Sequence, residues 1–173
     1  YDVDGMSING WSVIYSKKKP TIVYYGGNRE IIHKALDNYK RHYGKEFNFI
    51  SFEYPGYGLS TGQSSEKNFI KAMSHVTEKE LAANNLSFNK TVFVGRSIGS
   101  SVATQLAEKY SPAGVVLITP FDSILNLGHA RYPFLPLKTL LRHPFDSQAA
   151  ARNIDTPVLV IEAENDALVP VVH

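Results

Sequence analysis

The 173-residue sequence contains no cysteine, so disulfide bonds, thiolate metal sites and cysteine nucleophiles are all excluded. It also has no apolar run of the roughly 18 residues that a membrane-spanning helix needs. Neither sign of charge is in large excess, because 18 lysine and arginine residues are interspersed with 16 aspartate and glutamate residues. The resulting net charge of +2 gives no basis for nucleic-acid binding, and we expect no nucleic-acid partner.

What the sequence does contain is enough apolar material for a folded core, since 43% of its residues are hydrophobic. The length predicts a single domain over residues 1–173. Short runs rich in β-branched and aromatic residues predict strands, and the middle ones are nearly continuous in apolar residues, as in strands buried on both faces of a sheet. These runs are Trp11–Tyr15, Thr21–Tyr25, Phe47–Phe52, Thr91–Val94, Gly114–Ile118 and Pro157–Ile161.

Amphipathic stretches with one apolar stripe lie between these runs and predict helices at Arg29–Tyr43, Glu66–Ala83 and Ser97–Tyr110. The alternation predicts an α/β fold with a mostly parallel central sheet, helices on both faces and function at the C-terminal ends of the strands. The polar turn Ser16–Pro20 allows a hairpin between the first two strands, which would add an antiparallel edge.

The sharpest motif is Gly95–Gly99, a glycine-framed turn around Ser97 that follows one strand and precedes a helix. A serine hydroxyl is a weak nucleophile that needs exposure and a base, and a tight strand-to-helix turn provides the exposure. The N–H of Ile98 at the start of the helix is suited to stabilise an oxyanion, and Arg96 beside the serine is suited to attract an anionic group. The alternative is a glycine-rich turn that merely packs.

Two further loops follow strands at the same end of the predicted sheet. Gly26 and Gly27 let the chain turn, so that the main-chain N–H of Asn28 is the expected second donor of an oxyanion hole. The glycine-rich loop of residues 53–62, which contains Tyr57, is not followed by the Gly-Lys-Ser/Thr of a phosphate loop. We expect it to line the wall of the site, with Gly27, Arg96 and Tyr57 as the substrate contacts.

A carboxylate in a turn after a late strand can orient a histidine and stabilise its imidazolium. Asp166 has the best context for this role, ahead of its neighbours Glu162 and Glu164. Asp122, which follows an earlier strand, is the alternative.

Taken together and in this chain order, these motifs resemble the α/β-hydrolase superfamily over nearly the whole chain. They look closest to the small, cap-poor serine hydrolases that include membrane-associated depalmitoylase-like enzymes and their bacterial relatives. Arg131–Pro136 and His143–Ser147 are similar to that subgroup's segment before the acid strand. The resemblance implies an α/β-hydrolase fold in which Ser97 is the nucleophile and Asp166 the acid, with the N–H groups of Asn28 and Ile98 as the oxyanion hole. It makes residues 121–155 a short cap-like insert.

The histidine is where the chain departs from this family. The family's catalytic histidine follows one more helix and strand, on the order of 20 residues beyond the acid. Only seven residues follow Asp166, and His173 among them matches a structural histidine of the family. None of the other histidines follows the acid; they are His33, His42, His75, His129 and His143. We therefore expect a longer natural protein whose last strand, last helix and catalytic histidine lie beyond His173.

The sequence thus predicts a serine hydrolase that cleaves an ester or thioester bond of a small-molecule acyl substrate through an acyl-enzyme. The apolar residues of the insert either line an acyl pocket or pack on the sheet. A serine peptidase of the same fold is the alternative enzyme, and the absent histidine motivates a non-catalytic α/β-hydrolase-like binding protein. We expect no metal and no cofactor, since the histidines form no ligand cluster. Any membrane association would come from a segment outside this sequence.

Overall fold

The computed structural model describes residues 1–126, 134 and 145–163. Its centre is a six-stranded sheet with the strand order β3-β5-β4-β6-β7-β8. The strands span Gly10–Val13 (β3), Thr21–Tyr25 (β4), Asn48–Phe52 (β5), Thr91–Arg96 (β6), Gly114–Ile118 (β7) and Val158–Ile161 (β8). Every pairing is parallel except that of β3 with β5. The predicted mostly parallel sheet with an antiparallel edge is therefore confirmed.

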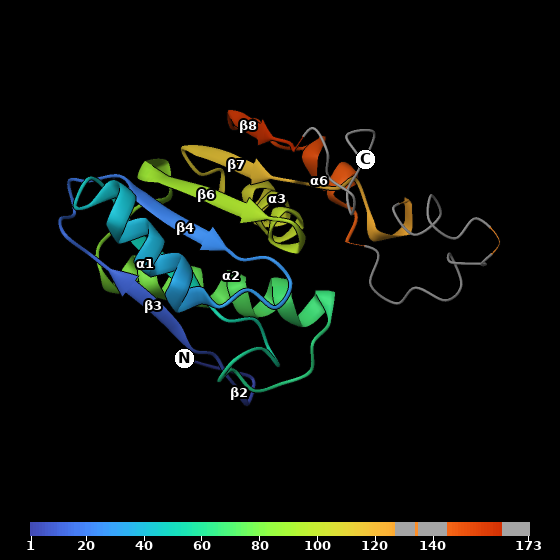
Figure 1. The fold of residues 1–173 in the computed structure, drawn as a ribbon, viewed down its shortest axis with the longest axis horizontal. Coiled ribbons are helices and arrows are strands. Elements are labelled where there is room, and N and C mark those ends of the chain that lie inside the picture. Colours follow the sequence, from blue (N-terminus) through green and yellow to red (C-terminus); the bar gives the residue numbers. More distant parts are fainter. Residues whose placement is uncertain (127–133, 135–144, 164–173) are drawn as a thin grey trace.

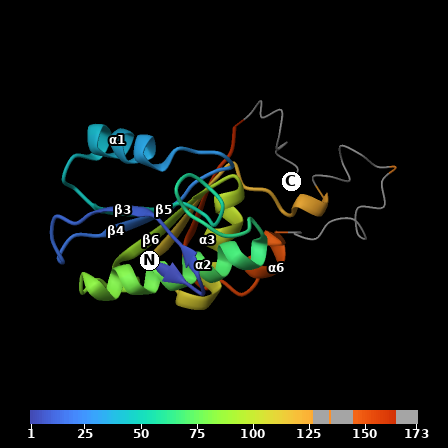
Figure 2. The same cartoon turned by 90° about the horizontal axis from the view of Figure 1, so that it is seen from below.

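Helices cover both faces of this sheet, as Figure 2 shows. One face carries α1 (Ile32–Tyr43), whose Leu36 and Tyr39 pack on Phe49 of β5. The other face carries α2, α3 and the larger core, and the short α6 packs beside α3. These elements are α2 (Glu66–Ala83), α3 (Ile98–Tyr110) and α6 (Ser147–Ala151), and a short 3-10 helix at Phe88–Lys90 leads into β6. All three predicted helices are present, although α1 begins at Ile32 and not at Arg29.

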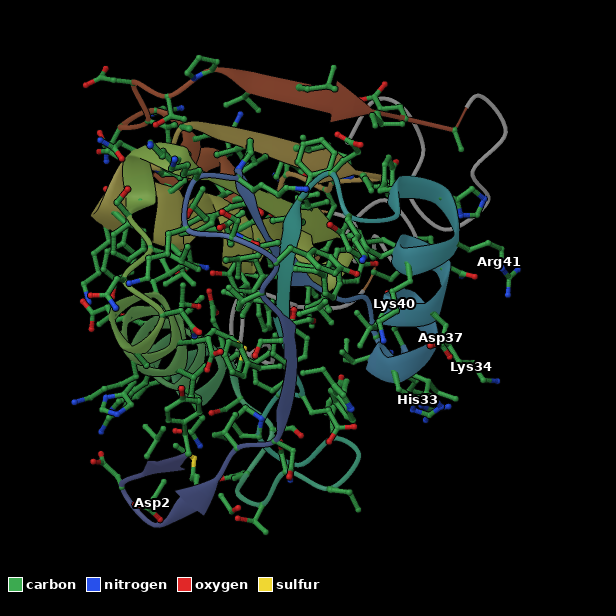
Figure 3. The ribbon with its side chains drawn as sticks, turned by 90° about the vertical axis from the view of Figure 1, so that its left-hand side faces the viewer. Asp2, His33, Lys34, Asp37, Lys40 and Arg41 are labelled. Carbon is green, nitrogen blue, oxygen red and sulfur yellow. The ribbon has the colours of Figure 1, made fainter. Side chains whose placement is uncertain are left out.

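The outer face of α1 is charged, which explains the single apolar stripe of its sequence. Lys34, Asp37 and Arg41 project from it away from the sheet in Figure 3, and all three are exposed. Among the described residues, no helix combines the length and the apolar character that crossing a membrane requires.

The predicted hairpin between the first two strands is wrong, because β5 lies between β3 and β4 and pairs with both. The Ser16–Pro20 turn is therefore a connection across the end of β5. Asn48, fully buried at the start of β5, holds this connection. Its Oδ1 accepts hydrogen bonds from the N–H groups of Tyr15 (2.9 Å) and Ser16 (3.2 Å), and its Nδ2 donates to the Ser16 carbonyl (2.9 Å). Apolar patterning identifies strands but not their neighbours, so the strand order stayed open in the sequence.

A small antiparallel pair at the N-terminus, β1 (Asp2–Val3) and β2 (Met6–Ser7), was not predicted. Strands of two residues show no periodic pattern that a sequence could reveal. The pair fastens the glycine-rich loop of residues 53–62, because the main chain of Ser7 exchanges hydrogen bonds with the hydroxyl and N–H of Thr61, each at 2.8 Å. The N-terminal segment thereby contributes to the shape of the loop that follows β5.

Asn48→Ala is expected to lower the free energy of unfolding by about 2–4 kcal/mol, since it leaves several buried main-chain groups without a partner. Asn38→Ala on the exposed side of α1 is the matched control and is expected to change stability by less than about 0.5 kcal/mol. Urea denaturation of both variants measures the difference. Equal stabilities would contradict the assigned role of Asn48.

Candidate functional site

The candidate site lies where two neighbouring parallel strands end. Strands β4 and β6 are paired in register, Tyr25 opposite Gly95, so their carboxyl ends meet at one edge of the sheet. Figure 1 shows both arrowheads pointing to that edge. The loop of Gly26–Asn28 leaves β4 there, and Ser97 follows β6. In open α/β sheets this edge is where ligands bind.

Ser97 occupies the tight turn between β6 and α3 in a strained backbone conformation, with φ 51° and ψ −120°. Side chains other than glycine rarely adopt positive φ, so the surrounding structure must hold the residue there. Its N–H donates to the carbonyl of Ile118 at 2.9 Å, and its own carbonyl accepts from the N–H and hydroxyl of Ser100 at 2.8 and 2.6 Å. Its side chain is only half-buried, so the hydroxyl is presented at the surface of the turn.

The two glycines that frame this turn are required by close backbone contacts. A Cβ at Gly99 would lie 2.0 Å from the carbonyl oxygen of Tyr25, and a Cβ at Gly95 would lie 2.3 Å from the carbonyl oxygen of Gly99. Both distances are well inside van der Waals contact. The two glycines of the motif therefore allow the start of α3 to pack closely against the ends of β4 and β6.

The Gly26–Asn28 loop lies beside Ser97, since a Cβ at Gly27 would be 3.7 Å from the Ser97 Cβ. Two tyrosines of the loop after β5 hold it. Tyr54 donates its hydroxyl to the Gly26 carbonyl at 2.9 Å, and Tyr57 donates to the side-chain oxygen of Asn28 at 2.7 Å. Burial raises the pKa of both phenols above the usual value for tyrosine, so they stay protonated as donors.

The N–H groups of Asn28 and Ile98 are available at this edge. Within the described part of the chain, neither donates to a protein acceptor, whereas the N–H of Gly27 is taken by the carboxylate of Glu30 at 2.7 Å. The N–H of Ile98 belongs to the first turn of α3, where a helix leaves its donors without partners. Two free N–H groups near the half-buried Ser97 form an arrangement that can stabilise negative charge.

The predicted substrate contacts fall into two environments. Tyr57 and Asn28 line a groove of about 870 Å³ between the loop after β4 and the glycine-rich loop, and exposed Ile31 and Leu59 add apolar surface to it. Arg96, by contrast, is directed to a carboxylate, with its Nη1 3.6 Å from Glu30.

Of the acid candidates, Asp122 and Glu162 are described and Asp166 lies outside the described residues, as does Glu164. Asp122 accepts hydrogen bonds from the N–H of Ser123 (2.6 Å) and the side-chain amide of Asn126 (2.7 Å), while its carbonyl accepts from the N–H of Ser147 (2.9 Å). These contacts tie the turn after β7 to the start of α6.

The described histidines lie in three different places. His33 lines the same groove as Asn28 and Tyr57, and its ring lies 6.3 Å from the Trp11 ring. The Nδ1 of His42 contacts the Asn38 carbonyl at 2.8 Å, and His75 lines a separate surface cleft with residues of β1 and α2. His129, His143 and His173 lie outside the described residues.

The described ends of the predicted insert belong to the core, since Phe121 and Phe145 are buried in the cluster under the sheet. Apart from Phe134, residues 127–144 lie outside the described residues, and the predicted acyl pocket falls mostly on them. In the part of the chain with described coordinates, no three His, Asp or Glu side chains gather as metal ligands would.

Glu30 and Tyr54 are the contributors that the sequence did not reveal. Glu30 stood at the beginning of a predicted helix, and Tyr54 stood in a loop whose glycines attracted attention. Neither position carries a periodic or motif signal.

Gly99→Ala is expected to destabilise the protein by about 1–3 kcal/mol or more, because the new methyl group meets backbone that can yield only if α3 moves. Gly114→Ala is the matched control, since its Cβ would make only ordinary contacts, the nearest at 3.7 Å. We expect this control to lie within about 1 kcal/mol of the unsubstituted protein. Thermal unfolding followed by circular dichroism compares the two, and a Gly99 variant as stable as the Gly114 variant would refute the close approach.

Curated relatives match between 73% and 98% of this chain. No family model matches it. It is 29% identical over 169 residues to an uncharacterized protein of Mycobacterium tuberculosis, covering 96% of this chain and 60% of that protein. It is 26% identical to the alpha/beta hydrolase domain-containing protein WAV2 of Arabidopsis thaliana, and the match covers 98% of this chain and 61% of that protein. It is 30% identical over 126 residues to the human alpha/beta hydrolase domain-containing protein 17C, and the match covers 73% of this chain and 37% of that protein. The chain thus spans about 60% of the length of the first of these relatives.

Solved structures show the same fold at low sequence identity. A putative hydrolase from Agrobacterium vitis superposes with a TM-score of 0.69 at 20% identity, covering 98% of this chain and 78% of that one. The thioesterase domain from the curacin biosynthetic pathway gives 0.72 at 12% identity, covering 97% and 83%. The esterase RhEst1 from Rhodococcus gives 0.66 at 18% identity, covering 98% and 81%. With its mostly parallel sheet and its helices on both faces, the chain has the α/β-hydrolase fold, and its relatives include proteins named for an alpha/beta hydrolase domain.

Proposed function

We propose that the protein is a serine hydrolase that cleaves an ester or thioester acyl bond, with Ser97 as the nucleophile. The observation that carries this proposal is the strained turn at Ser97, where φ is 51° and the framing glycines meet backbone at 2.0 and 2.3 Å. Such strain costs about 1–3 kcal/mol and persists where function depends on it. A turn that merely packed would have no need of a serine at this position.

In the proposed reaction, the Ser97 oxygen adds to the acyl carbonyl while a base takes its proton. The carbonyl oxygen becomes an oxyanion that accepts hydrogen bonds from the N–H groups of Asn28 and Ile98. Collapse expels the alcohol or thiol, which takes the proton from the base, and leaves an acyl ester on Ser97. Water, deprotonated by the same base, then releases the carboxylic acid and restores the serine.

The proposed acid is Asp166, and the proposed base is a histidine outside the described residues. Asp166 comes shortly after β8, the last strand of the sheet, and this place in the sequence supports the choice of Asp166 over Asp122. His42 contacts the Asn38 carbonyl on α1 and His75 lines a separate cleft beside β1, which supports a base outside these two histidines.

The groove beside Asn28 is the proposed site for one side of the substrate. It runs from the proposed oxyanion donor to apolar Ile31 and Leu59, which suits a partly apolar acyl or alcohol group. The names of two structural neighbours, an esterase and a thioesterase domain, support an oxygen or sulfur ester over an amide.

Ser97→Ala is expected to abolish labelling by a fluorophosphonate probe, because the probe phosphonylates an activated serine. Ser12→Ala, which removes an exposed serine hydroxyl from the edge strand β3, is the matched control and is expected to label like the unsubstituted protein. Gel fluorescence after probe treatment measures both. Undiminished labelling of the Ser97 variant would assign the reactive serine elsewhere, and a protein that never labels would favour a binding role.

A further inference from the structure

Glu30 is the most heavily engaged charged residue beside the proposed oxyanion hole. Its carboxylate accepts the N–H of Gly27 at 2.7 Å and the hydroxyl of Tyr24 at 2.9 and 3.0 Å. The guanidinium of Arg96 lies 3.6 Å away, and the Glu30 side chain is only 18% exposed. These partners come from β4, from the loop that follows it and from the turn that holds Ser97.

The geometry points to Glu30 as a positioning residue that decides which N–H of the Gly26–Asn28 loop faces the substrate. The inference rests on the proposed function, in which the N–H of Asn28 is an oxyanion donor. Glu30 donates its own N–H to the Gly27 carbonyl at 3.2 Å while its side chain accepts the Gly27 N–H. The turn is therefore closed from both sides, and the first N–H left for a ligand is that of Asn28.

The backbone of this turn needs such a restraint. Arg29, between Asn28 and Glu30, has a φ of 57°, which is unfavourable for a side chain other than glycine. Without the two bonds between Gly27 and Glu30, the turn would relax toward ordinary φ values. The N–H of Asn28 would then lose its fixed direction.

A carboxylate this close to a developing oxyanion would oppose catalysis if its charge were uncompensated. The Glu30 carboxylate is compensated by the positive charge of Arg96 and by hydrogen bonds from the Tyr24 hydroxyl and the Gly27 N–H. Burial, followed by the neighbouring carboxylate of Glu30, raises the pKa of Tyr24, so the phenol remains a donor. Arg96 is thereby assigned the neutralisation of Glu30, and its contact with an anionic group of the substrate stays a prediction.

The activity test compares Glu30→Ala with Glu78→Ala, because alanine removes the acceptor of the Gly27 N–H whereas glutamine would keep one. Glu78 is an exposed residue on α2 with a similar ion pair, 3.7 Å from Lys109. For hydrolysis of p-nitrophenyl acetate we expect Glu30→Ala to lower kcat about 10- to 100-fold and leave KM within about threefold, since a misplaced donor weakens the transition state more than substrate binding. Glu78→Ala should change neither constant. Equal kcat values for the two variants, or a loss confined to KM, would overturn the inference.

A double-mutant cycle tests the neutralising role of Arg96. We expect Arg96→Gln to lower kcat severalfold, and the Glu30→Gln/Arg96→Gln protein to be no slower than Glu30→Gln alone, because Arg96 has no carboxylate left to neutralise. Multiplicative losses in the double variant would refute this part.

Amide hydrogen exchange followed by NMR tests the positioning without reference to catalysis. The Gly27 amide should exchange at least about tenfold faster in Glu30→Ala than in Glu78→Ala, since alanine removes the acceptor of this N–H. If the unsubstituted protein hydrolyses no ester, the proposed function has failed, and the Gly27 exchange rate still decides whether Glu30 holds the loop. Unchanged exchange in Glu30→Ala would overturn the inference on its own.

Discussion

The rest of the site depends on the close contact between Gly99 and the carbonyl oxygen of Tyr25. A Cβ atom at position 99 would lie only 2.0 Å from that oxygen, so no other residue fits there. This contact presses the first turn of α3 against the end of β4. It brings two loops together that lie about 70 residues apart in the chain, one with Ser97 and one with Asn28. If the width of one methyl group displaced α3, Ser97 would move away from the loop that carries the proposed oxyanion donor.

The second level of organisation is the fastening of the loop after β4. Gly26, Gly27 and Asn28 are each held by a different side chain, Tyr54, Glu30 and Tyr57, respectively. Two of these come from the loop after β5, which is itself fastened to the N-terminal strand pair through Ser7 and Thr61. The loop after β4 is thus held by its own Glu30 and by the loop after β5, which in turn is held by the first residues of the chain.

Much of the fold was accessible from the sequence because buried parallel strands are apolar throughout and surface helices are striped. The Gly95–Gly99 motif was accessible for a related reason, since glycines on both sides of a serine after a strand mark a close approach. The strand order could not be predicted, because apolar patterning does not show which strands are neighbours. The role of Asn48 was hidden with it, since its partners are main-chain groups of Tyr15 and Ser16, more than 30 residues away in the sequence. The role of Glu30 stayed hidden for the same reason, as its partners Tyr24 and Arg96 become neighbours only when β4 and β6 pair.

The positive φ of Ser97 also bears on how such a chain responds to selection. Glycine would occupy that backbone conformation without strain, so the serine lowers the stability of the fold it belongs to. A library of variants sorted only for resistance to heat would tend to replace this serine and discard the hydroxyl with it. Thermostability and the proposed reactivity are thus opposed at this one residue, and engineering of the chain has to retain the hydroxyl explicitly.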